Sequence, residues 1–260
     1  MSGEKKLIDV LGIGVDPVNT EKVKSWVFDQ IKFRGGKTIA FATVNGVMCC
    51  EQDDSVRSAF ESADMVVPDG MPMVWLGKNQ GFKSTDRVYG PELMWEICAS
   101  GVERRMSHFL LGGKEGVADQ LKKRFEKEFK GIQICGTLSP PFRTLRDDEW
   151  EAIKAELEEK SPDLVWVGLG SPKQELFMQR MQGAGVGVFL GVGAAFDIYT
   201  GSLKDSPQWV KKMGMQWFHR FLQEPRRLWY RYLVLNPLFI FQLIRRSFTR
   251  DKSIKKGELE

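Results

Sequence analysis

DLVWVGLGSPKQELFMQRMQGAGVGVFLGVGAAFDIYTG, residues 163–201, contains two short apolar runs that each end in glycines. Residues 164–167 and 186–190 lack polar alternation, a pattern typical of parallel strands that are buried on both faces. The turns Gly168–Gly170 and Gly191–Gly193 follow them, and glycines at the carboxyl end of such strands let a ligand approach the backbone closely. The stretch therefore predicts two buried parallel strands with a ligand at their carboxyl ends.

The segment between the two runs predicts the start of a helix. Ser171 stands in the N-cap position, Pro172 in the first helical position and Gln174 three residues after the serine. This spacing alone favours Gln174 as a capping partner, and a ligand contact is the alternative. Because a helix N-terminus beside a buried strand is an anion site, we expect a ligand that carries phosphate.

The same alternation of strand and helix runs through most of the chain. Further strands are expected at residues 7–14, 38–43, 65–67, 107–111 and 132–135, and a helix is expected at residues 44–62. This order predicts an α/β fold with a mostly parallel, Rossmann-like sheet that helices cover on both faces. We expect an α/β catalytic domain over residues 1–202 and a helical C-terminal appendage over residues 203–260.

The expected appendage differs from the rest of the chain in charge. It contains 13 Lys and Arg against 5 Asp and Glu, a net charge of +8, which leaves −4 for residues 1–202 because the whole chain carries +4. It is also rich in aromatic residues, and Pro225 and Pro237 are expected to divide it into helices of about ten residues. A basic, aromatic segment of this kind suits an anionic membrane surface.

The longest apolar run of the appendage, residues 232–244, is shorter than the roughly 20 residues that a membrane span needs. Two interpretations remain open: the segment lies on a membrane as an interfacial helix, or its apolar face packs on the domain. The residues that support the first interpretation are Leu235, Leu238, Phe239, Ile244, Arg245, Arg246 and Arg250.

Metal and thiol chemistry find little support in the sequence. The four cysteines form no C-x-x-C pair, and the histidines are His108 and His219, of which His108 falls in an expected strand and is interpreted as a core residue. No Asp-x-Asp pair is present. We expect neither a metal nor a cofactor, so that Arg, Lys and helix N-termini must stabilise any departing diphosphate.

Several polar residues fall where ligands bind in open α/β sheets, at the ends of expected strands. Asp69 is the best candidate for a general base, although a turn Asp that bonds its own backbone is the alternative. Thr43 and Asn45 end the second strand. A Thr or Asn at this position caps the next helix, or binds sugar hydroxyls while it does so. Asp197 is a candidate for ribose or sugar contacts, or else begins a turn.

Three arginines of the appendage form a further candidate set. Arg227 and Arg231 are four residues apart, hence on one helical face, and Arg220 precedes Arg227 by seven residues. They are interpreted either as a phosphate-binding group or as a solvated basic face.

The order of seven short motifs resembles the WecG/TagA/CpsF glycosyltransferase family, also called glycosyltransferase family 26. The resemblance covers roughly residues 7–235, and its Pro-Lys-Gln-Glu and Gly-Ala-Phe-Asp-type blocks are specific in combination. The motifs are Thr43-x-Asn45, Pro68-Asp69-Gly70, Asp86-Arg87-Val88-x-Gly90, Leu110-Leu111-Gly112-Gly113, Gly168-Leu169-Gly170-x-Pro172-Lys173-Gln174-Glu175, Gly191-Val192-Gly193-Ala194-Ala195-Phe196-Asp197 and Glu224-Pro225-x-Arg227.

The resemblance implies an inverting, metal-independent hexosyltransferase of bacterial cell-surface polysaccharide synthesis. The donor would be a UDP-sugar of the N-acetylmannosaminyl, N-acetylmannosaminuronyl or glucosyl type, and the acceptor a polyprenyl-diphosphate-linked saccharide. The enzyme would be cytoplasmic and peripheral to the inner face of the cell membrane, with no nucleic-acid partner and with homo-oligomerisation left open. By the same resemblance Asp69 is the base, and the substrate-binding residues are Thr43, Asn45, Arg87, Gln174, Asp197, Arg220, Arg227 and Arg231.

Two motifs depart from the family pattern. Lys204-Asp205-Ser206-Pro207 replaces its usual Arg-Ala-Pro, and Met215-Gln216-Trp217 replaces its usual Leu-Glu-Trp. Two other functions compete with the transferase: a dinucleotide-dependent oxidoreductase and a non-catalytic, membrane-associated nucleotide-binding protein. The first βα turn, residues 12–17, lacks the third glycine of a dinucleotide fingerprint. Binding of UDP without turnover would favour the non-catalytic protein.

Overall fold

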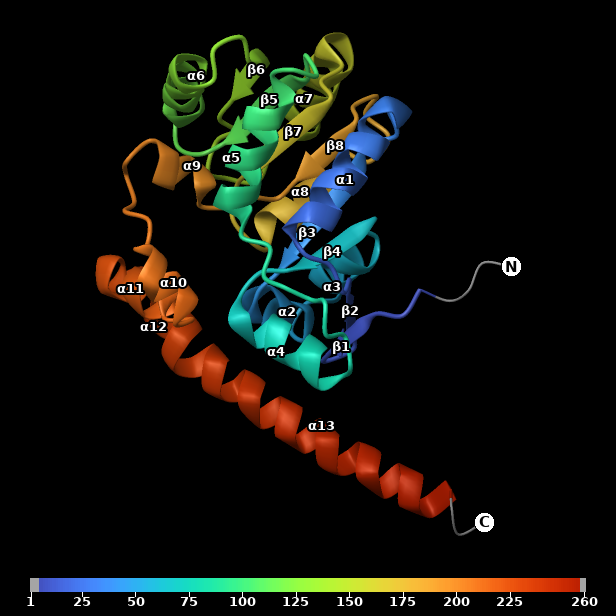
Figure 1. The fold of residues 1–260 in the computed structure, drawn as a ribbon. Helices are drawn as coiled ribbons and strands as arrows, with labels where there is room; N and C mark the ends of the chain where they lie inside the picture. The colour runs from blue at the N-terminus through green and yellow to red at the C-terminus, as the bar shows by residue number, and fades with distance from the viewer. Residues whose placement is uncertain (1–4, 258–260) are drawn as a thin grey trace.

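The computed structural model describes residues 5–257, with the side chains of Lys212 and residues 248–257 outside the description. Within these residues, a six-stranded sheet has the order β4-β3-β8-β7-β5-β6, and every neighbouring pair is parallel (Figure 1). The predicted α/β fold with a Rossmann-like sheet is confirmed. The strands are β3 (Lys37–Ala42), β4 (Met65–Pro68), β5 (Ser107–Gly112), β6 (Gln133–Leu138), β7 (Leu164–Gly168) and β8 (Val188–Leu190).

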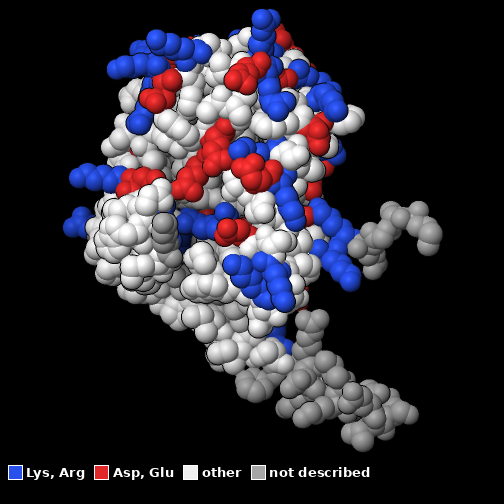
Figure 2. Space-filling model, viewed as in Figure 1, with Lys and Arg blue, Asp and Glu red and all other residues white. Residues whose placement is uncertain are grey.

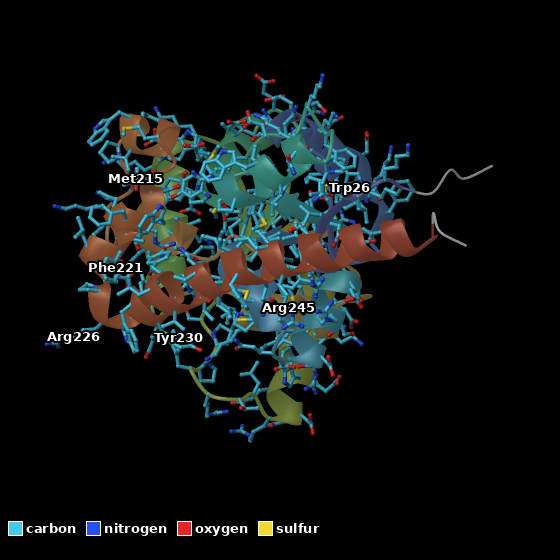
Figure 3. The ribbon with its side chains drawn as sticks, turned by 90° about the horizontal axis from the view of Figure 1, so that it is seen from below. Trp26, Met215, Phe221, Arg226, Tyr230 and Arg245 are labelled. Carbon is cyan, nitrogen blue, oxygen red and sulfur yellow. The ribbon has the colours of Figure 1, made fainter. Side chains whose placement is uncertain are left out.

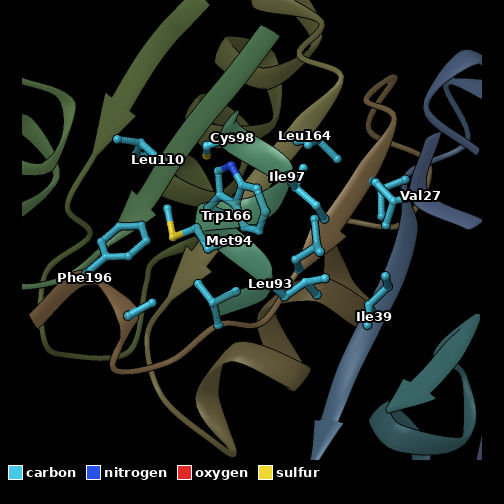
Figure 4. Packing of buried hydrophobic residues seen from close by; sticks show 14 of the residues in the cluster. Val27, Ile39, Leu93, Met94, Ile97, Cys98, Leu110, Leu164, Trp166 and Phe196 are labelled. Atoms are coloured by element: carbon cyan, nitrogen blue, oxygen red, sulfur yellow. The ribbon is translucent and has the colours of Figure 1, made fainter. Parts of the chain in front are cut away.

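One face of the sheet is covered by the helices α1 (Thr20–Gln30), α5 (Gly90–Gly101), α6 (Val117–Glu128) and α9 (Ala195–Tyr199). Alternate residues of each strand point to this face, so Leu164 and Trp166 of β7 enter its core. Figure 4 shows Trp166 packed among side chains of α5 and β5. Its indole nitrogen donates to His108 Nδ1 at 3.1 Å. His108 is a core residue, as predicted, and burial lowers its pKa to about 4. Its Nδ1 accepts this bond, whereas its Nε2 has no hydrogen-bond partner among the described residues.

The opposite face is covered by α2 (Val44–Cys50), α3 (Asp54–Glu61), α7 (Asp147–Lys160) and α8 (Lys173–Arg180). Val165 and Val167, the alternate residues of β7, pack there with Phe177 of α8. The layer is completed at one end by α4 (Met71–Asn79). A short 3-10 segment, η1 (Ile31–Phe33), ends α1 before β3 begins.

Residues 7–14 do not form the single strand that was predicted. They form a hairpin of β1 (Ile8–Val10) and β2 (Ile13–Val15), paired antiparallel in a sheet of its own. The chain reverses because Leu11 and Gly12 both adopt positive φ angles, 52° and 81°, which close a tight turn. The apolar residues of the hairpin pack in one cluster with α2 and α4.

Two predicted helix boundaries were also wrong. Residues 44–62 contain two helices because the Asp53 side chain accepts a hydrogen bond from Ser55 N at 2.8 Å and starts α3. α8 begins at Lys173, with Pro172 rather than Ser171 as its N-cap residue. Gln174 is therefore not the capping-box partner that the spacing favoured.

The expected appendage is helical. It contains α10 (Gln208–Lys212), α11 (Gln216–Gln223), α12 (Pro225–Tyr230), the π-helical turn η2 (Arg231–Leu235) and α13 (Asn236–Gly257). Pro225 divides the segment as predicted, but Pro237 does not. It lies in the first turn of α13 directly after η2, where the missing N–H of proline is tolerated.

Along η2 and α13, one face of the apolar run packs on the domain, as one of the two interpretations predicted. Leu235 and Phe239 are 4% and 3% exposed and join the core cluster of α2, and Arg246 pairs with Glu51 at 3.2 Å. Ile240, Phe241 and other apolar side chains of the opposite face are exposed. Figure 3 shows α13 crossing the underside of the molecule, while Arg226 of α12 points away from it. Of the described helices, none is long and apolar enough to cross a membrane.

Candidate active site

A cavity of about 180 Å³ lies at the carboxyl ends of β3 and β4, where α11 and η2 meet the sheet. Six of the nine predicted site residues line it although they are distant in sequence. They are Thr43, Asn45, Asp69, Arg87, Arg220 and Arg231. We call this space the Asp69 cavity.

Asp69 is placed in the cavity by the end of β4. Its backbone N–H donates to Ala42 O at 3.0 Å, which continues the pairing of β4 with β3 for one more residue. Gly70 then turns the chain with a φ of 112°, a conformation that other residues rarely adopt, and α4 begins. Burial raises the pKa of the Asp69 carboxyl, and the positive charge of Arg87 opposes this effect.

Arg87 faces Asp69 because its segment is tied to the same strand. Val88 N donates to Pro68 O at 2.9 Å. Arg87 Nε then lies 3.5 Å from Asp69 Oδ1, an ion pair longer than a hydrogen bond. The guanidinium also lies 4.4 Å from the ring centre of Tyr89, whose hydroxyl donates to Asp205 Oδ1 at 3.0 Å. Asp205, in the motif that departs from the family pattern, thus holds the tyrosine against Arg87.

Thr43 and Asn45 belong to the first turn after β3. Thr43 Oγ1 accepts a hydrogen bond from Gly46 N at 3.0 Å, so this residue caps α2 as one of the two interpretations proposed. The bond uses an oxygen lone pair and leaves the hydroxyl proton for a ligand. Asn45 is 8% exposed and lines the cavity beside it.

The appendage supplies the remaining charges. Arg220 from α11 and Arg231 from η2 both line the cavity. Burial lowers the pKa of Arg231, and the nearby charges of Arg220 and Arg227 act in the same direction. Arg227 itself is exposed, pairs with Glu224 at 2.9 Å and is not among the described residues that line the cavity.

Gln174 and Asp197 lie along the same edge of the sheet but line neither the Asp69 cavity nor the larger cavity described below. Gln174 is 3% exposed, and its Nε2 donates to Gly191 O at 2.6 Å and to Glu175 Oε1 at 3.0 Å. Gly191 permits this contact, because a Cβ there would lie 2.9 Å from Gln174 Nε2. Asp197 stands in the first turn of α9, half-buried.

A larger cavity of about 720 Å³ lies further along the edge, at the ends of β5 and β7. Gly113 and Gly168 form its floor near the sheet, and Lys173 stands at its side from the first turn of α8. Aromatic side chains also line it, with the Lys173 ammonium 5.6 Å from the ring centre of Phe142 and the Arg180 guanidinium 4.4 Å from that of Trp150.

The comparison with protein families decides the classification. The model of the "Glycosyl transferase WecG/TagA/CpsF family" matches residues 8–253, nearly the whole chain. The protein belongs to this family.

Two curated relatives of this WecG/TagA/CpsF protein come from Bacillus. One from Bacillus subtilis (strain 168) is 26% identical over 223 residues, which cover 85% of this chain and 81% of the relative. One from Bacillus spizizenii is 25% identical over 210 residues, which cover 80% and 79%. Both are named N-acetylglucosaminyldiphosphoundecaprenol N-acetyl-beta-D-mannosaminyltransferase.

Sequence reasoning missed several residues that line the Asp69 cavity of this family member. Tyr89, Trp217 and Tyr232 supply aromatic walls, and Gln216 supplies an amide. Gln216 and Trp217 belong to the second motif that departs from the family pattern, which was the signal available in the sequence. Tyr89 and Tyr232 gave no such signal because tyrosine at these positions also suits ordinary packing.

No group of three or more His, Cys, Asp and Glu side chains that could hold a metal occurs among the described residues. Within residues 5–257 the four cysteines are free. The charged groups that line the Asp69 cavity of this family member are one carboxylate and three guanidinium groups.

Proposed function

We propose that the protein transfers N-acetylmannosamine from a UDP-sugar to a polyprenyl-diphosphate-linked N-acetylglucosamine, with inversion and without a metal. The observation that carries this proposal is the Asp69 carboxylate, held at the sheet edge in a cavity with Arg87, Arg220 and Arg231. The names of the two Bacillus relatives supply the acceptor and the sugar.

Asp69 serves as the general base of this reaction. Its carboxylate takes the proton of the acceptor hydroxyl while the hydroxyl oxygen forms a bond to the anomeric carbon of the donor sugar. The bond between that carbon and the diphosphate oxygen breaks on the opposite side, so the configuration inverts and UDP leaves with the bonding electrons. The raised pKa of Asp69 makes it a better base than an exposed aspartate.

The arginines stabilise the diphosphate charge. Guanidinium groups offer several N–H donors in a fixed plane and keep their charge, which suits phosphate oxygens. Arg87 comes from the segment after α4, whereas Arg220 and Arg231 come from the appendage. A lipid-linked acceptor that reaches the cavity would therefore contact the appendage and the sheet together.

The nucleoside of the donor fits the larger cavity. At about 720 Å³ it lies within the range of 300–1,000 Å³ that is usual for small-molecule sites. Its aromatic residues offer stacking surfaces, and Lys173 in the first turn of α8 offers a charge and a helix N-terminus for phosphate. In this arrangement the donor runs along the sheet edge toward Asp69, past Gln174 and Asp197.

Membrane attachment follows from the exposed apolar side chains of the appendage. Trp209, Trp217, Trp229 and Phe241 are 65%, 41%, 52% and 60% exposed. Figure 2 shows that the surface over α10–α12 is mostly uncharged on the face in view. Interfacial segments combine such residues with Lys and Arg, and the net charge of +8 on residues 203–260 adds attraction to anionic lipids. We infer a peripheral position on a lipid surface.

A transfer assay in EDTA tests the proposal. The purified protein is given UDP-N-acetylmannosamine and a short polyprenyl-diphosphate N-acetylglucosamine, and the product is identified by mass spectrometry and its anomeric configuration by NMR. We expect a disaccharide product with inverted configuration in the presence of EDTA. Activity that chelation abolishes and Mg²⁺ or Mn²⁺ restores would show that the metal-independent part is wrong. Failure to use UDP-N-acetylmannosamine, alongside use of another UDP-sugar, would change the assigned donor.

A further inference from the structure

Within the described residues, three buried N–H groups of the Asp69 cavity have no hydrogen-bond partner. They are Arg220 Nε, Gln216 Nε2 and Arg87 Nε, of which Arg87 Nε has Asp69 Oδ1 as an ion-pair partner at 3.5 Å, beyond hydrogen-bond distance. A buried donor without a partner costs free energy, so such groups in a folded protein call for a bound water, ion or ligand. The three come from separate segments, the loop before α5 and two turns of α11. Three converging donors call for a ligand with several acceptor oxygens.

The charges of the cavity specify the ligand further. Asp69 is the single carboxylate among the described lining residues, against three arginines, so the cavity has an excess of positive charge. A diphosphate combines negative charge with many acceptor oxygens. Gln216, 7% exposed and at the first position of α11, adds a donor without adding charge.

We propose that Gln216 is a binding residue for a diphosphate in the Asp69 cavity, to which it donates a hydrogen bond through Nε2 beside Arg220. The inference rests on the proposed function and extends it by a residue and by the group that the residue contacts. A carboxylate at this position would accept the charge of Arg220, four residues further along the same helix. The amide adds no second carboxylate next to Arg220, which already pairs with Glu224 at 3.7 Å.

Two substitutions at Gln216 distinguish the loss of its hydrogen-bond donor from the addition of a negative charge. Gln216→Met keeps the length of the side chain and removes the N–H, and Gln216→Glu replaces the amide by a carboxylate. Gln208→Glu, on an exposed residue of α10, is the matched control for added charge. Calorimetry with UDP and with farnesyl diphosphate distinguishes the two sources of a diphosphate, nucleotide and lipid.

We expect Gln216→Met to weaken the binding of the diphosphate that occupies the cavity by about tenfold, the size of one hydrogen bond to a charged group. Gln216→Glu should weaken it further, and Gln208→Glu should bind as the wild type does. The melting temperature of Gln216→Met should be unchanged or higher, because an unpartnered buried amide has been removed.

If Gln216→Met binds only UDP more weakly, the cavity holds the diphosphate of the donor. If it binds only farnesyl diphosphate more weakly, the cavity holds the diphosphate of the acceptor. If it binds both more weakly, the cavity accepts a diphosphate from either substrate. Each of these results supports the proposal. Wild-type affinity for both probes in Gln216→Met and Gln216→Glu overturns it, as does a wild type that binds neither probe. A lower melting temperature in Gln216→Met would show that the amide is structural. The transfer assay tests the proposed function separately, because a wild type that binds a diphosphate without transferring sugar would contradict that function alone.

Discussion

Asp69, which is half-buried, and Glu175, which is buried, are both carboxyl groups near the carboxyl edge of the sheet, and their surroundings give them different roles. Asp69 pairs with Arg87 at the wall of a cavity, whereas Glu175 is 1% exposed and contacts the amide of Gln174. Burial raises the pKa of both groups. The nearby arginine keeps Asp69 available as an anion, while Glu175 has no described cation as an ion-pair partner.

We predict that Asp69→Asn lowers kcat by about 100-fold or more, the usual contribution of a general base. The affinity for UDP should change little, because the amide has nearly the same shape. In the wild type, activity should rise with pH through a pKa above the ordinary 3.8 of an aspartate, since the base must be ionised. Steady-state kinetics with a pH profile checks both statements. A variant with wild-type kcat would remove Asp69 from the mechanism.

The Glu175 carboxyl predicts a pH dependence of stability. Its pKa is raised to about 7 from 4.5, mainly by burial. Below pH 4.5 the group is protonated in the folded and unfolded states alike; as the pH rises toward 7 the unfolded chain loses its proton first, so the folded state loses stability. Above pH 7 both states are ionised, and burial of the ionised Glu175 then lowers the free energy of unfolding by on the order of 3 kcal/mol.

Glu175→Gln removes this ionisation. The variant should unfold at higher urea concentration than the wild type at pH 8, and the two should be nearly equal at pH 4.5. Urea unfolding at both pH values measures the difference. An equal difference at both pH values would contradict the assigned protonation.

Single residues were predictable from the sequence where their position at a strand end was visible. Asp69, Thr43 and Asn45 were placed correctly because they directly follow apolar runs. For Gln174 the spacing alone favoured a cap over a ligand contact, because helix-start spacing does not show that the side chain reaches Gly191, directly after β8. For Gln216, the only indication of a role in the site that the sequence offers is its departure from a family motif.

At the scale of secondary-structure elements, the turn from α12 to η2 separates two arginines that the sequence placed together. Arg231 lines the Asp69 cavity, and Arg227, four residues earlier, pairs with Glu224 at the surface. Both remain candidates for phosphate binding, because Arg227 is close enough to lower the pKa of Arg231. Their contributions should nevertheless differ.

We predict that Arg231→Ala lowers kcat/KM for the lipid-linked acceptor by at least tenfold more than Arg227→Ala does. The buried guanidinium contacts the ligand in a desolvated site, whereas an exposed ion pair contributes roughly 0–1 kcal/mol. The measurement is acceptor-dependent kinetics at saturating donor, with UDP binding as the control for folding. Equal losses in the two variants would mean that both arginines reach the acceptor.

The strands of the large sheet were predicted well because buried parallel strands are uniformly apolar and end in glycine or polar residues. The hairpin of β1 and β2 was not, since Ile8 to Val15 has the same composition as one longer strand and the reversal depends on the φ angles of Leu11 and Gly12. The break between α2 and α3 depends likewise on one side-chain cap at Asp53. The spacing of apolar residues along the sequence does not reveal local hydrogen bonds of this kind.

At the scale of the whole molecule, the chain distributes charge and apolar surface unevenly. Residues 203–260 carry a net charge of +8 and residues 1–202 a net charge of −4. The sequence showed this asymmetry and the approximate start of the helical segment, but it left open which side chains would be exposed. The answer depends on the packing of α13 against α2, which buries Leu235 and Phe239.

We predict that replacing both Ile240 and Phe241 by Ser weakens binding to phosphatidylglycerol vesicles by at least tenfold. These side chains are 56% and 60% exposed, and each can bury apolar surface in a lipid interface. Vesicle co-sedimentation at low and high salt measures the loss. Phe33→Ser, on another exposed aromatic residue in η1, should bind as the wild type does. Undiminished binding by the double variant would assign attachment to another surface.

The lining of the Asp69 cavity runs from Thr43 to Asn236, so it is drawn from nearly the entire length of the polypeptide. During synthesis the ribosome releases β3 and β4 long before α11 and η2, and a nascent sheet therefore holds its carboxylate without the arginines of the appendage. The anion site is complete only after η2 has been synthesised. Proteolytic clipping between α9 and α10 would reverse this step, leaving the strands of the sheet intact but removing two of the three cavity arginines.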